Sequence, residues 1–87
     1  MFPASSLASP PVRQQVLRII GRRAPVRQRL QRNLHLVREL YFDLLDIVNV
    51  ILDLERCFHI SIPDEVPFVT VGDFVDYVAA ELLAPRR

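Results

Sequence analysis

The hydrophobic positions of this 87-residue chain recur every three or four residues in three separate stretches, which is the spacing of amphipathic helices. Between residues 11 and 21, aliphatic side chains alternate with glutamine and arginine, while Pro11 and Gly21 suit the start and the end of a helix. We therefore predict a first helix over residues 11–21. A long connection follows over residues 22–42, with leucines spaced to hold it on a core and with room for a short helical turn around residues 26–31.

The second predicted helix follows Asp43 and runs to about Cys57, because this segment contains neither proline nor glycine. Asp43 is suited to cap the helix. Asp46 lies in its first turn, where a negative charge interacts favourably with the positive end of the helix dipole. On a helical wheel of residues 44–58, the apolar residues cover roughly two-thirds of the circumference. This is more than one core-facing stripe needs.

A final amphipathic helix is predicted from the segment that begins with Thr70 and Asp73, whose spacing resembles a capping box, to near Ala84. Before it, residues 61–65 predict an extended entry and a short turn that Pro67 ends. The expected fold is all-α, a bundle of three main helices plus one short helix.

Length and composition describe one small domain, with a hydrophobic content of 51% that suffices for a core. We expect a flexible N-terminus over residues 1–9, one folded domain over residues 10–84 and a C-terminal tail over residues 85–87. No apolar run approaches the roughly 20 residues that cross a bilayer, and the first residues do not resemble a secretory signal. Together with a lone cysteine, this favours a cytoplasmic location.

The charge of the chain is unevenly distributed, although its net value is only +1. Eight arginines precede the first acid, Glu39, and all ten acids follow with Arg56 as the one base among them. Such asymmetry can indicate a nucleic-acid-binding arm. We favour the interpretation that the basic first helix and loop lie against the acidic remainder or face water, because aliphatic core positions are interleaved with the arginines.

Five segments, taken together, are similar to the acyl carrier protein family and its peptidyl carrier relatives. They occur in the family's order and at nearly its spacing, over residues 16–21, 33–40, 43–46, 54–65 and 70–78. The resemblance implies the carrier's helical bundle. It also implies that carrier function depends on a 4′-phosphopantetheine arm attached to a serine in an aspartate-serine-leucine-aspartate motif.

In this chain the motif reads Asp43, Leu44, Leu45 and Asp46, so leucine stands in place of the serine. Leucine has no nucleophilic atom, and the expected cofactor content is therefore none, with phosphopantetheine absent. Modification at another hydroxyl is an alternative, although neither Tyr41 nor the more distant serine and threonine hydroxyls stand in the motif's register.

The second helix is instead expected to bind a protein partner. Its core face should be formed by residues such as Val50 and Leu54, whereas other apolar side chains lie beyond that face. Contiguous exposed apolar surface commonly marks a contact site, and a larger core covered by the leucines of residues 34–40 is the alternative. The candidate partner-binding residues are Leu44, Leu45, Val48, Leu52, Asp46, Asp53 and Arg56.

No catalytic or metal-binding pattern emerges from the remaining polar residues. His35 and His59 have no metal-ligand spacing with Cys57, His59 is expected on the surface, and Cys57 is expected to be a small buried residue. Asp64 and Glu65 read as solvated loop carboxylates. The chain is therefore predicted not to be an enzyme.

The sequence thus favours a non-catalytic, acyl-carrier-like protein that acts by contact. It would form a homodimer or dock on a fatty-acid, polyketide or peptide synthesis enzyme. Two alternatives stay open: a functional acyl carrier modified at an atypical residue, and an arginine-rich domain that binds nucleic acid.

Overall fold

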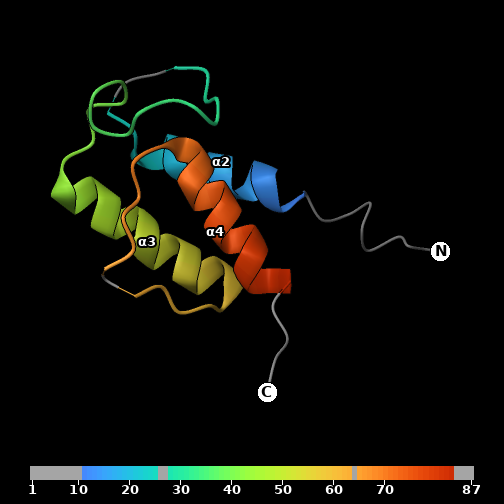
Figure 1. The fold of residues 1–87 in the computed structure, drawn as a ribbon. Coiled ribbons are helices and arrows are strands. Elements are labelled where there is room, and N and C mark those ends of the chain that lie inside the picture. The colour runs from blue at the N-terminus through green and yellow to red at the C-terminus, as the bar shows by residue number, and fades with distance from the viewer. Residues whose placement is uncertain (1–10, 26–27, 64, 84–87) are drawn as a thin grey trace.

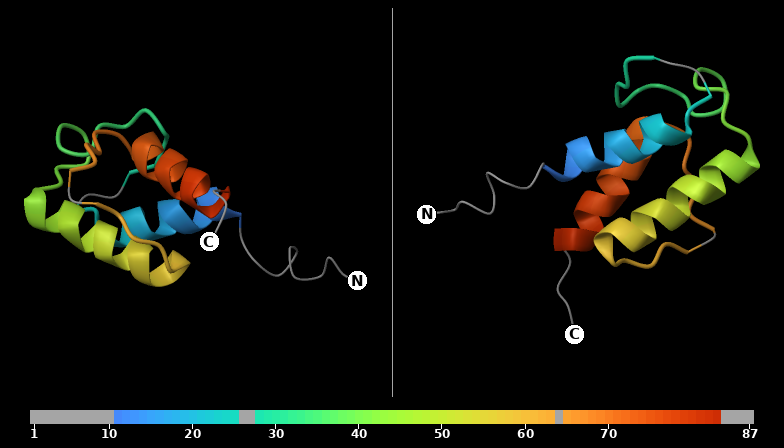
Figure 2. Two further views of the ribbon diagram at one scale, coloured as in Figure 1. Left: turned by 60° about the horizontal axis from the view of Figure 1, so that its bottom comes forward. Right: turned by 180° about the vertical axis from the view of Figure 1, so that it is seen from behind.

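Three helices are packed around one core in the computed structural model, which describes residues 11–25, 28–63 and 65–83 (Figures 1 and 2). They are α2 (Val12–Arg23), α3 (Leu44–Phe58) and α4 (Val71–Leu83). Within these residues no strand forms, and the one β-bridge pairs His35 with Thr70. The prediction of an all-α bundle with three main helices is confirmed.

Helix α2 continues two residues beyond its expected end at Gly21. Gly21 keeps a negative φ and therefore does not act as a left-handed terminator. The helix ends instead at Ala24, which is extended, with a ψ of 129°, and whose N–H donates to the carbonyl oxygen of Ile20. Pro25 follows, and a residue before proline is disfavoured in the helical region. The terminating signal is thus this proline and not the glycine.

Helix α3 begins where the sequence predicts and ends one residue after Cys57. The Asp43 carboxylate accepts a hydrogen bond from the backbone N–H of Asp46 at 2.8 Å, and the Asp46 carboxylate accepts one from the N–H of Asp43 at 3.1 Å. This reciprocal capping box satisfies two backbone donors that the first turn leaves without partners. At the other end, His59 adopts a left-handed conformation with a φ of 56°.

Helix α4 also starts with a capping box, as the sequence predicts. The N–H of Asp73 donates to Thr70 Oγ1 at 3.3 Å, and the Asp73 carboxylate accepts from the N–H of Thr70 at 3.0 Å. The short fourth helix expected before Pro67 is not formed by the described residues of that segment. A single turn, in which the N–H of Val66 donates to the carbonyl of Pro63 at 3.4 Å, takes its place.

The long connection from α2 to α3 lies at the end of the bundle where α4 begins (Figure 1). Its leucines Leu34, Leu36 and Leu40 are buried, as expected. Backbone hydrogen bonds from Leu36 N–H to Val69 O (2.9 Å) and from Val71 N–H to Leu34 O (3.0 Å) fasten it to the entry of α4. The helical turn considered around residues 26–31 falls partly outside the described residues, and residues 28–31 are not helical.

The core is formed by all three helices and this connection. Phe74 of α4 is fully buried and is the largest side chain there, with Val16, Ile20, Val50 and Leu54 among its fully buried companions. The core face predicted for the second helix is therefore confirmed at Val50 and Leu54.

Gly72 marks a close approach between α4 and the connection. Its N–H donates to the carbonyl oxygen of Arg32 at 2.8 Å, and a Cβ at this position would lie 2.9 Å from that backbone oxygen. Because a backbone atom cannot swing aside, we expect Gly72→Ala to lower the free energy of unfolding by about 1–3 kcal/mol in urea denaturation. Gly21→Ala is the matched control, since a Cβ there meets only the end of the Leu30 side chain at 3.6 Å. Equal losses in the two variants would contradict this account.

Candidate functional site

Four apolar side chains lie exposed along one side of α3. Leu44 is 76% exposed, Leu45 65%, Val48 40% and Leu52 45%. Leu44, Val48 and Leu52 are spaced four residues apart and therefore form one row, with Leu45 beside it. We call these four residues the α3 apolar surface. The alternative expectation, a larger core covered by residues 34–40, is not met, because those leucines turn inward and leave the described surface open.

The α3 apolar surface starts at the first residue of the helix. Leu44 follows the N-cap Asp43 directly and projects from the helical end that the capping box holds in place. Tyr41, three residues earlier, is 65% exposed and has a φ of 60°. A bulky side chain rarely adopts this left-handed conformation, so Tyr41 marks a strained backbone position just before the helix.

The motif position does not fit a phosphopantetheine attachment site. A phosphodiester needs a nucleophilic oxygen, and the exposed side chain that stands there is a hydrocarbon. Thr70 Oγ1 is already an acceptor in the α4 capping box, and Ser61 lies beyond the far end of α3. The exposed Tyr41 hydroxyl belongs to a side chain three residues before Leu44, so none of the hydroxyls considered as substitutes occupies the motif position itself.

The acids predicted to bind a partner are both engaged within the chain. Asp46 belongs to the capping box, and Asp53 accepts hydrogen bonds from Arg23 Nε at 2.9 Å and Arg23 Nη2 at 3.3 Å. The Arg23 hydrogen bond lowers the pKa of the Asp53 carboxyl, outweighing the opposing effect of its partial burial. Arg56 is exposed and has no ion pair within the described residues. Of the three charged candidates, only Arg56 is fully available.

The basic first part of the chain was expected to lie against the acidic remainder or to face water, and two ion pairs join the two parts. Besides Arg23 with Asp53, Arg32 contacts Asp76 of α4 at 2.6 Å. Both pairs join segments that lie 30 or more residues apart in sequence, so periodicity alone could not have found them.

Cys57 was expected in the core, and this prediction is wrong. Its thiol is exposed on α3, 4.0 Å from Gln15 Oε1 of α2. The helical wheel explains the difference, because residue 57 follows the polar side of α3, where α2 meets α3 through Arg23 and Asp53. The expectation of a surface position for His59 is confirmed.

Metal binding finds no support in the described part of the chain, where no group of three or more histidine, cysteine or acidic side chains is placed to hold an ion. His35 Nδ1 accepts a hydrogen bond from the N–H of Arg38 at 3.1 Å, which gives this histidine a structural role. None of the described helices is long and apolar enough to cross a membrane.

Sequence similarity relates this chain to known proteins. No family model matches the chain. Two curated relatives, from Helicobacter pylori and Helicobacter acinonychis, are each 46% identical to it over 50 residues, and both are named acyl carrier protein. By sequence, the chain is acyl-carrier-like. The matched region is 55% of this chain and 64% of either relative, so the acyl-carrier-like chain covers less than two thirds of their length.

Proposed function

We propose that this acyl-carrier-like chain is not an enzyme, carries no phosphopantetheine and acts through protein contacts made by the α3 apolar surface. The observation that carries the proposal is Leu44, an exposed hydrocarbon side chain at the start of α3, where the motif would require a hydroxyl. A carrier with an arm delivers an acyl group as a thioester. Without the arm, this chain would act only by binding another protein.

The apolar chemistry of the surface suits such a role. Burying a leucine side chain stabilises a complex by roughly 1.5–3 kcal/mol, so four apolar side chains can support an interface of moderate strength. Leu44 and Leu45 contribute most, because they are the two most exposed of the four.

The favoured occupant of this surface is a second copy of the chain. Acidic side chains stand at the start of α3, at Asp43 and Asp46, and the unpaired Arg56 stands near its end. Two copies of α3 packed antiparallel would bring Arg56 of each copy toward the acidic start of the other, with the apolar rows between them. A twofold interface of this kind is the commonest arrangement of homo-oligomers.

Docking on a biosynthetic enzyme is the second candidate, supported by the name of the two relatives, acyl carrier protein. An enzyme that binds carriers transiently would be expected to contact their surface acids with basic side chains of its own. Here Asp53 is already paired with Arg23 within the chain, which favours a contact dominated by apolar side chains.

The absence of an arm is tested by mass spectrometry. We expect the purified chain, incubated with coenzyme A and a phosphopantetheinyl transferase of broad specificity, to show no change in intact mass, because Leu44 offers no oxygen to the transferase. A conventional acyl carrier protein treated in the same way serves as the positive control. A gain of one phosphopantetheine would contradict the proposal, and peptide mapping would then identify the atypical attachment residue.

A further inference from the structure

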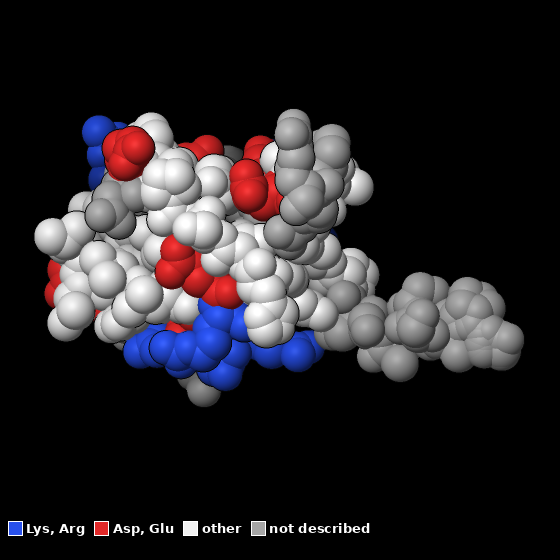
Figure 3. Space-filling model, turned by 90° about the horizontal axis from the view of Figure 1, so that it is seen from below, with Lys and Arg blue, Asp and Glu red and all other residues white. Residues whose placement is uncertain are grey.

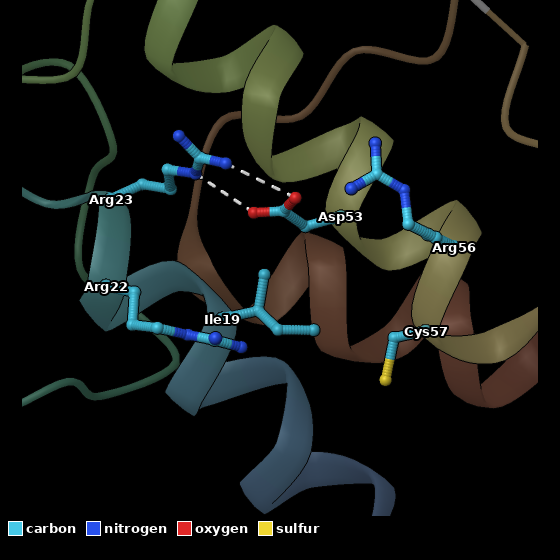
Figure 4. A pocket seen from close by; sticks show the side chains of 6 residues that line it. All are labelled: Ile19, Arg22, Arg23, Asp53, Arg56 and Cys57. Atoms are coloured by element: carbon cyan, nitrogen blue, oxygen red, sulfur yellow. Dashed lines mark hydrogen bonds and ion pairs between the residues drawn. The ribbon is translucent and has the colours of Figure 1, made fainter.

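A hollow of about 470 Å³ lies between the C-terminal half of α2 and α3, and none of the four residues of the α3 apolar surface lines it. Figure 4 shows the side chains around it: Arg22 and Arg23 from α2, Arg56 and Asp53 from α3, with Ile19 and Cys57 as the less polar part of the lining. A second hollow adjoins it, shares Ile19, Arg22 and Cys57 with the first, and adds Arg18.

The charges around this hollow are not balanced by the chain itself. Asp53 is its one acidic side chain and is occupied by Arg23. Arg22 and Arg56 have no ion pair within the described residues, nor does Arg18. On the face shown in Figure 3, many of the basic side chains form one continuous band, which acidic side chains adjoin, while other basic side chains lie apart from it.

Arg18 and Arg22 are exposed neighbours on α2 that a bound anion would bring into a favourable interaction. They are four residues apart on α2, so both lie on the same side of the helix, where like charges repel. Arg22 stands in the last turn of α2, where a basic residue stabilises the helix. Arg23 stands there too and forms an ion pair with Asp53. Arg56 likewise stands in the last turn of α3, but it borders the same hollow as Arg22 and adds to the positive charge there.

We propose that the hollow between α2 and α3 binds a small ligand that carries phosphate groups, with Arg22 and Arg56 as its principal contacts. Guanidinium groups match the geometry of phosphate oxygens and donate two hydrogen bonds at once. The volume lies within the range of small-molecule sites, and Ile19 supplies an apolar wall for an uncharged part of the ligand. Arg18, in the adjoining hollow, would contact a second phosphate group.

A small ligand is favoured over a nucleic acid because exposed arginines of two helices, Arg22 and Arg56, converge on one hollow. A nucleic-acid backbone would draw on arginines along the whole band, whereas a compact anion depends on the few around the hollow. No aromatic side chain lines either hollow to stack on a base.

The test uses the full chain and inorganic pyrophosphate as the probe. We expect pyrophosphate, titrated at constant ionic strength, to shift the backbone amide NMR signals of Ile19, Arg22 and Cys57 in a saturable manner. Arg22→Gln and Arg56→Gln should each weaken binding by about tenfold, because each removes charge-assisted hydrogen bonds to the anion. Asp53→Asn should tighten binding several-fold, because it releases Arg23 and removes the one negative charge.

The matched control is Arg13→Gln, which removes the same charge at the other end of α2 and should leave affinity within twofold of wild type. Thermal unfolding by circular dichroism verifies that each variant is folded. Leu44→Asp should retain or tighten pyrophosphate binding, because separation of the proposed pair would free Arg56 from the acids of the other copy, whereas loss of the pair and of pyrophosphate binding together would contradict two separate sites.

Three results would overturn the proposal. The first is absence of saturable shifts in the wild-type chain. The second is equal weakening by Arg13→Gln and Arg22→Gln, or weakening by Asp53→Asn. The third is tighter binding of a single-stranded DNA oligonucleotide that Arg13→Gln reduces as much as Arg22→Gln does, which would assign the whole arginine band to nucleic acid.

Discussion

Leu44→Asp is expected to convert the chain from a dimer into a monomer in size-exclusion chromatography with light scattering at about 100 μM protein. Leu44 is 76% exposed in a single copy and would be buried in the proposed pair. An isologous interface contains each substitution twice, so the loss of two buried leucines at roughly 1.5 kcal/mol each weakens association by about 100-fold or more. Burial of the introduced carboxylates adds to this loss.

Leu83→Asp provides the matched control for this prediction. Leu83 is 85% exposed at the end of α4 and lies outside the α3 apolar surface, so the same change of side chain should leave the dimer intact. Arg56→Asp is expected to weaken the pair less than Leu44→Asp, because its charge contact would lie at the rim of the interface. A wild-type chain that is monomeric under these conditions would contradict the assignment of a second copy and favour docking on another protein.

Local chemistry made much of the fold predictable from sequence. The capping pairs Asp43 with Asp46 and Thr70 with Asp73 act over three residues, and both form as expected. Periodicity placed Val50 and Leu54 in the core, because burial follows directly from the face of the helix on which a residue lies. The end of α2 was misplaced because glycine and Pro25 are competing signals, and the steric effect of proline prevailed.

The candidate site was predictable to a lesser degree. The exposure of Leu44 and Leu52 follows from the wheel of α3 alone, and the structure agrees with it. The pairing of Arg23 with Asp53 and the exposure of Cys57 depend instead on how α2 is docked against α3. Periodicity within one helix contains no information on that docking. The arginine-lined hollow was missed for the same reason, although the excess of arginine in the first half of the chain was its visible signal.

Phe74→Ala is expected to cause the largest loss of stability among single substitutions in the described core. Phe74 is the largest fully buried side chain, and its ring is stacked on that of Phe68 with the centroids 4.2 Å apart. Truncation of a buried phenylalanine costs about 3–5 kcal/mol, against a total of about 5–15 kcal/mol for a typical domain. Urea denaturation followed by circular dichroism should therefore show a much lower midpoint with an unchanged slope.

Phe68→Ala tests whether burial or ring stacking is responsible, because it removes the same ring pair from a partly buried position. We expect it to lose less than half as much stability as Phe74→Ala, and equal losses would contradict the assignment of Phe74 as the centre of the core.

The same measurement connects the core to the α3 apolar surface. If a second copy binds the folded chain alone, mass action raises the unfolding midpoint with protein concentration. That dependence should persist in Phe74→Ala, whose substitution lies inside the bundle, and should vanish in Leu44→Asp, whose substitution lies on its outside. A concentration dependence that survives Leu44→Asp would place the contact between copies on a different part of the molecule.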